Sequence, residues 1–77
     1  MSERRFVFWV DGVQFDHTVH TISGAQIRAM VPRLESYYHL WMEGIGDEPD
    51  QKIDHMTSVS IEANSARFYT VPPTIGG

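Results

Sequence analysis

The sequence predicts an α+β fold in which one helix packs on one face of a mixed sheet of four to five strands. Two apolar segments, 6–10 and 13–19, flank an Asp-Gly pair, and a single stretch has helical periodicity. The other apolar segments are short and alternate with polar residues. A chain of 77 residues forms one small domain. It is too short for a doubly wound α/β fold and too poor in helical segments for a bundle.

The chain begins with a predicted β-hairpin. Phe6 to Val10 is rich in residues that favour strands, and Asp11-Gly12 is a strong signal for a two-residue turn. Val13 to Val19 supplies the return strand. Alternation along the first strand places Phe8 on the core side of the sheet and Trp9 on the opposite side.

A helix is expected from Ile22 to Val31. Ser23 is a favourable N-cap and Gln26 follows three residues later, which completes a capping box. Pro32 ends the helix because it disfavours helical backbone in the residue before it. The apolar stripe with i, i+3, i+4 and i+7 spacing consists of Ile27, Met30, Val31 and Leu34.

The remaining strands are expected in the second half of the chain. Tyr37 to Glu43 alternates, with Leu40 on the core side and Trp41 on the other. Residues 52–57 are expected to be irregular, and Ser58 to Ile61 forms a short strand. The last strand, Arg67 to Val71, pairs in parallel with the first and stops at two prolines, which have no donor for the ladder. A hairpin, a helix and a returning last strand are typical of a β-grasp domain, here residues 1–71.

Composition excludes several classes of function. The net charge is −4 and the six basic residues are scattered, whereas nucleic-acid binding needs a clustered basic face. Without cysteine, the chain has no disulfide, no thiolate metal site and no cysteine nucleophile. Neither a membrane-spanning apolar run nor a signal-peptide core is present in the sequence. We therefore expect a soluble cytoplasmic protein without nucleic-acid or membrane partners.

No spacing in the sequence indicates a metal or catalytic site. The acidic run from Asp47 to Asp50 lacks the full ligand pattern of a calcium loop. No Ser-His-Asp triad or carboxylate pair is suggested, so we expect a chain that is not an enzyme and binds no cofactor. The histidines, whose spacing does not suit two ligands on one strand face, are His17, His20, His39 and His55.

The C-terminal segment 72–77 is expected to be a flexible tail. Glycine lacks Cβ, so a Gly76-Gly77 end can lie extended in a narrow slot and leave its carbonyl carbon open to a nucleophile. Such an end suits a carboxylate that another protein activates and transfers. The alternative is an end without any role. At about 3.1 Å per residue, the segment reaches about 19 Å from Val71.

The sequence resembles bacterial multiubiquitin-domain proteins, which are relatives of ubiquitin. The segments that carry the resemblance are Val10-Asp11-Gly12, Thr21 to Ala29, Tyr38-His39-Leu40, and Arg67 to Pro73 followed by Gly76-Gly77. The resemblance spans nearly the whole chain and implies a β-grasp modifier of other proteins. An E1-like enzyme would adenylate Gly77 with ATP, and the acyl group would pass through E1 and E2 thioesters to target proteins. A JAB-type peptidase would trim or reverse the bond.

The resemblance also implies roles for residues in the tail. Gly76 and Gly77 are the conjugation site. The tail segment that the E1 recognises is Pro72, Pro73, Thr74 and Ile75. Unlike the tail of eukaryotic ubiquitin, this one contains prolines and no arginine, so its recognition cannot depend on arginine contacts. Lys52 is the only lysine of the chain, and it is therefore the one candidate acceptor for lysine-linked chains.

A partner-docking patch is expected on the sheet face opposite the core. It consists of Trp9, Trp41, Tyr69 and Val71. Related folds dock partners there, and stability alone poorly explains exposed aromatic residues. The alternative is a tolerated apolar surface, or one that loops cover.

Two further functions stay open at this point. A sulfur carrier of the same fold would convert Gly77 to a thiocarboxylate. A non-covalent interaction module would use the docking patch and would not need its tail.

Overall fold

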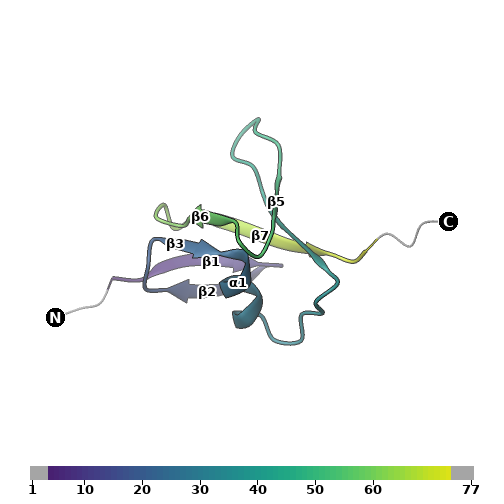
Figure 1. Cartoon of the computed structure of the whole chain (residues 1–77). Coiled ribbons are helices and arrows are strands. Elements are labelled where there is room, and N and C mark those ends of the chain that lie inside the picture. Colours follow the sequence, from purple (N-terminus) through teal and green to yellow (C-terminus); the bar gives the residue numbers. More distant parts are fainter. Residues whose placement is uncertain (1–3, 74–77) are drawn as a thin grey trace.

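The computed structural model describes residues 4–73, in which one helix accompanies a five-stranded mixed sheet and a two-stranded sheet (Figure 1). The predicted α+β class is confirmed. The elements are β1 (Phe6–Val10), β2 (Val13–His17), β3 (Thr21–Ser23), α1 (Gly24–Met30), β4 (His39–Met42), β5 (Gln51–Ile53), β6 (Ser58–Ser60) and β7 (Ala66–Val71). The larger sheet has the order β2-β1-β7-β4-β5, and β3 pairs with β6.

The last strand, β7, lies at the centre of the larger sheet. It runs parallel to β1, with Val10 opposite Phe68. On its other side it runs antiparallel to β4, with Trp41 opposite Tyr69. The predicted parallel pairing of the first and last strands is therefore confirmed. It leaves β2 and β5 as the two edge strands.

The β1–β2 turn forms at the predicted Asp-Gly pair. Asp11 has φ 50° and Gly12 has φ 81°, and a tight hairpin turn of this kind requires left-handed backbone at both central residues. The turn sets the register, with Val10 opposite Val13. The return strand ends at His17, two residues before the expected Val19.

The helix begins later than the sequence predicts. The expected start at Ile22 was wrong, because Thr21–Ser23 forms β3 and pairs with β6. The capping box is confirmed: the Ser23 hydroxyl accepts from the Gln26 amide at 3.2 Å, and the Gln26 side chain accepts from the Ser23 amide at 2.9 Å. The helix ends at Met30, with Val31 as an extended C-cap.

A close backbone contact fixes the start of the helix. The Gly24 amide donates to the Thr57 carbonyl at 3.0 Å, and the Ala25 amide donates to the His55 carbonyl at 3.1 Å. A Cβ atom at position 24 would lie 2.1 Å from the Asp54 carbonyl oxygen. Glycine therefore lets α1 dock directly on the segment between β5 and β6.

The segment 52–57, which we expected to be irregular, contains part of β5. Ile53 lies opposite Leu40 and Lys52 lies opposite Trp41. Ile53 is buried and Lys52 is exposed, but a strand of three residues is too short to show alternation in the sequence. Two other expected strands are shorter than predicted, since β4 lacks Tyr37, Tyr38 and Glu43 and β6 lacks Ile61.

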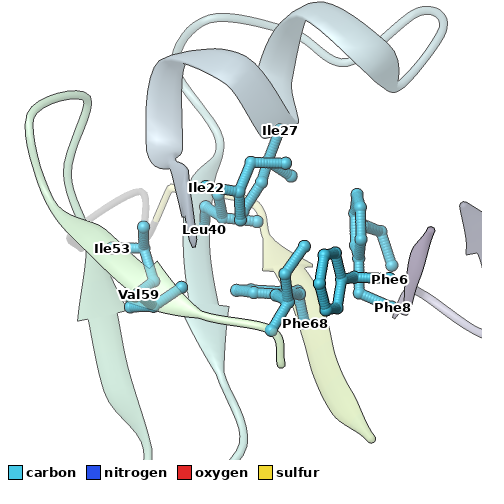
Figure 2. Close-up of a cluster of buried hydrophobic side chains, with 10 residues drawn as sticks. Phe6, Phe8, Ile22, Ile27, Leu40, Ile53, Val59 and Phe68 are labelled. Atoms are coloured by element: carbon cyan, nitrogen blue, oxygen red, sulfur yellow. The ribbon is translucent and has the colours of Figure 1, made fainter. Parts of the chain in front are cut away.

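The core lies between the larger sheet and the helix. Figure 2 shows Ile27 extending from α1 toward Ile22 and Leu40. Phe8 and Phe68, on neighbouring strands, meet edge to face with ring centroids 5.7 Å apart. The buried apolar side chains are Phe6, Phe8, Val10, Ile22, Ile27, Leu40, Ile53, Val59, Ile61 and Phe68.

We predict that Gly24→Ala destabilises the protein by about 1–3 kcal/mol, because the added methyl group must displace backbone rather than a movable side chain. In a helix with open space at this position, the same change is stabilising. The sign of the change in unfolding free energy therefore shows whether the close contact exists. Urea denaturation measures it. A variant as stable as the wild type would contradict the close contact between α1 and Asp54.

Candidate functional site

The residues of the predicted docking patch lie together on the sheet face opposite the core. In β1, Phe8 is buried and Trp9 is half-buried. In β7, Phe68 is buried and its neighbour Tyr69 is half-buried. Strand pairing places Trp41 beside Tyr69, and paired residues point to the same side of a sheet. We call Trp9, Trp41, Tyr69 and Val71, all of them half-buried, the outer patch.

Arg67 joins this surface, although the sequence gave no indication of its contact. It pairs with Trp9 across β1 and β7, and its guanidinium carbon lies 4.9 Å from the centroid of the Trp9 ring. This distance permits a cation–π interaction. Because Arg67 is itself exposed, it adds a positive charge to the edge of the outer patch.

Two further residues, on β4 and β5, lie beside the outer patch. Lys52, the candidate acceptor, is exposed and lies opposite Trp41. His39 is half-buried and lies opposite Val71. The surface is thus aromatic at its centre and carries Arg67 and Lys52 at its borders, in a protein whose net charge is −4.

Tyr69 is held by a hydrogen bond to the loop before β5. Its hydroxyl donates to Asp50 Oδ2 at 2.5 Å, and the Gly44 amide donates to Asp50 Oδ1 at 2.9 Å. The bond from Tyr69, followed by the bond from Gly44, lowers the pKa of the Asp50 carboxyl from its ordinary value. The same bond to Asp50 raises the pKa of the Tyr69 phenol. Asp50, the last residue of the acidic run, therefore connects the loop to the outer patch.

The pKa shifts give the direction of the pH dependence. The pKa of Asp50 is lower in the folded protein, so its contribution to stability is present above the unfolded value near 3.8 and is lost as the pH falls through the folded pKa. The pKa of Tyr69 is higher in the folded protein. Its contribution is present below the unfolded value near 10.0 and is lost as the pH rises through the folded pKa.

The tail begins where β7 ends. Pro72 is exposed and Pro73 is half-buried. Neither residue belongs to a strand, as expected for prolines after a ladder. The other predicted tail residues, Thr74, Ile75, Gly76 and Gly77, lie outside the described residues, so their roles stay predictions.

The other features of the described chain do not involve the predicted site residues. Among residues 4–73, no cluster of three or more His, Cys, Asp or Glu side chains is placed to hold a metal ion. Within the same residues, no helix has the length and apolar character needed to cross a membrane. A hollow of about 140 Å³ is lined by Met42, Ile45, Ile61 and Ala66, among others, and by none of the predicted site residues.

No family model matches this chain, and no curated protein or solved structure matches it significantly. The geometry therefore carries the functional argument together with the sequence motifs. It offers an outward-facing surface of aromatic and cationic side chains, and two prolines, Pro72 and Pro73, that follow the central strand beside that surface.

We predict that Tyr69→Phe raises the pKa of Asp50 toward its ordinary value, because the largest of the interactions that lower it is removed. The Gly44 amide still donates, so the return is partial. Carboxyl-carbon NMR titration measures the shift. Tyr37→Phe is the matched control, since Tyr37 is 59% exposed. An Asp50 pKa that is the same in both variants would rule out the bond to Tyr69.

Proposed function

We propose that this chain is a cytoplasmic ubiquitin-like modifier of bacterial type with a β-grasp fold. An E1-like enzyme activates its C-terminal glycine, which then passes through E1 and E2 thioesters to target proteins. The observation that carries this proposal is the position of β7, which has a neighbour on each side and runs straight into Pro72. Pro72 thus directly follows a strand that the sheet holds on both sides.

The chemistry requires nothing of this chain except its carboxyl end. The Gly77 carboxylate attacks the α-phosphate of ATP and pyrophosphate leaves. A cysteine thiolate of the E1 then attacks the acyl carbon and AMP leaves, which produces a thioester. Gly76, without Cβ, fits a narrow slot. The segment from Pro72 to Ile75 spans the distance between that slot and the domain.

The outer patch supports this proposal because two of its residues lie on β7, the strand that leads into the tail. Tyr69 and Val71 face outward on β7, and Pro72 follows Val71 directly. A partner docked over Trp41 and Tyr69 is therefore close to the start of the tail. We assign the outer patch to the docking of the E1-like and E2-like enzymes and of the JAB-type peptidase.

The outer patch is also the observation that favours a non-covalent interaction module. An aromatic surface binds a partner whether or not the tail reacts. The sulfur carrier, in contrast, shares every feature of the modifier apart from the fate of the activated end. The experiments below therefore separate these functions at Gly77.

Incubation with ATP and an E1-like adenylating enzyme is expected to give an adduct that thiol reagents cleave. Deletion of Gly77 leaves the terminal carboxylate on Gly76, one residue short of the activating site, and is expected to abolish the adduct. Trp41→Ala is expected to slow adduct formation without preventing it. Gel electrophoresis with and without reductant measures the adduct. If the deletion has no effect while Trp41→Ala abolishes the function, the chain is an interaction module.

Intact mass spectrometry of the chain recovered from cells separates the two covalent functions. A modifier appears as the full-length chain joined to other proteins. A sulfur carrier appears as the free chain with one terminal oxygen replaced by sulfur. Detection of that replacement without conjugates would overturn the modifier.

Lys52→Arg is expected to abolish lysine-linked chains and to leave single transfers to targets intact. Lys52 is exposed and is the only lysine, and arginine keeps its charge but is not a nucleophile at neutral pH. The conjugate ladder on a gel measures the effect. A ladder that persists in the variant would show that the acceptor is a hydroxyl group or the amino terminus.

A further inference from the structure

Asp11 makes three hydrogen bonds to β7 near the end of that strand. Its amide donates to the Phe68 carbonyl at 3.0 Å. Its carboxylate accepts from the Thr70 amide at 3.0 Å and from the Thr70 hydroxyl at 2.6 Å. The hairpin turn between β1 and β2 thus binds the last strand through both its backbone and its side chain.

These bonds extend the contact between β1 and β7 beyond the strand pair itself. The parallel register ends with Val10 opposite Phe68, after which β1 turns away. The Asp11 carboxylate then takes the place of the next strand residue as the acceptor for Thr70. On the other side of β7, Thr70 lies opposite Leu40 of β4. Both hydrogen-bond donors of Thr70 are therefore taken up by Asp11 on the β1 side, two residues before Pro72.

We propose that Asp11 is a positioning residue that fixes the direction in which the tail leaves the domain, with Thr70 as its partner. This inference rests on the proposed function of Gly77. Without the carboxylate, the Thr70 amide and hydroxyl lose their acceptor. Only the pairing with β4 then holds this end of β7, which can pivot about that strand. The glycine end then enters the activating site in the required orientation less often, which slows adenylation.

The chain offers variants that separate this role from stability. Asp11→Gly removes the carboxylate and tolerates the φ of 50° at this position. Asp11→Asn keeps a side-chain oxygen that accepts from the Thr70 amide.

Asn64→Gly is the matched control. Asn64 is also a left-handed turn residue, with φ 58°, and its side chain accepts from the Val7 amide at 2.8 Å. This bond lies at the other end of β7, before Ala66. Asn64→Gly therefore removes a similar bond from a similar turn but leaves the start of the tail unchanged.

The first measurement is amide hydrogen exchange in the full chain, which needs no partner enzyme. Asp11→Gly is expected to lose protection at Thr70, whereas Asp11→Asn and Asn64→Gly keep it. Continued protection of Thr70 in Asp11→Gly would overturn the inference.

The second measurement is the rate of thioester formation with ATP and the E1-like enzyme. Asp11→Gly is expected to lower kcat about tenfold and to change KM by less than about twofold, because the outer patch that docks the enzyme is intact. Asp11→Asn is expected to restore most of the loss, and Asn64→Gly to have no effect. If Asp11→Gly and Asn64→Gly lower kcat equally, the loss reflects reduced stability and not positioning, which would overturn the inference.

The two proposals fail in different ways. If the wild-type chain is not activated, the proposed function is wrong and the positioning role falls with it. If the wild type is activated and Asp11→Gly is activated equally fast despite losing protection at Thr70, only the positioning role is wrong.

Discussion

The parallel pairing of β1 with β7 is the constraint on which the rest of this structure depends. It joins the two ends of the described chain, since the bond between Asp11 and Thr70 spans 59 positions. Closing so long a loop costs conformational entropy that local contacts do not repay. The packing of Phe8 against Phe68 across that pair offsets part of the cost. On its other side β7 pairs with β4, and β4 pairs with β5, so the second half of the sheet is joined to the first through β7.

A sheet built in this way has two unequal faces. The single helix of residues 4–73 covers one face, and alternation sends every second side chain to the other. The β7 side chains on the second face are Arg67, Tyr69 and Val71. They point away from the core, so core packing does not fix their positions. Instead, these side chains are placed by contacts within the face, such as Arg67 over Trp9 and Tyr69 to Asp50. Two of the three aromatic residues of the outer patch, Trp9 and Tyr69, are thus fixed by contacts outside the core.

Local signals in the sequence predicted most of the fold, and non-local contacts explain what they missed. The turn at Asp11-Gly12 and the capping box of Ser23 and Gln26 each depend on residues close together in the sequence, and both formed as expected. Strands β3 and β5 have three residues each and depend on partners distant in the sequence, so no periodicity revealed them. The outer patch followed from alternation alone. The contacts of Asp50 and Asp11 did not, because a carboxylate in a turn has the same sequence signature whether or not a strand passes beside it.

The central place of β7 also determines how the outer patch and the tail relate to each other. Tyr69 and Val71 face the outer patch, whereas Thr70 between them bonds to Asp11 through its hydroxyl and its amide. A partner that binds the outer patch therefore rests on direct neighbours of Phe68 and Thr70, the two residues to which the hairpin turn bonds. Docking on a fixed strand loses less conformational entropy than docking on a mobile one. Under the proposed function, the body of the protein therefore contributes to activation by holding the strand that leads into Pro72.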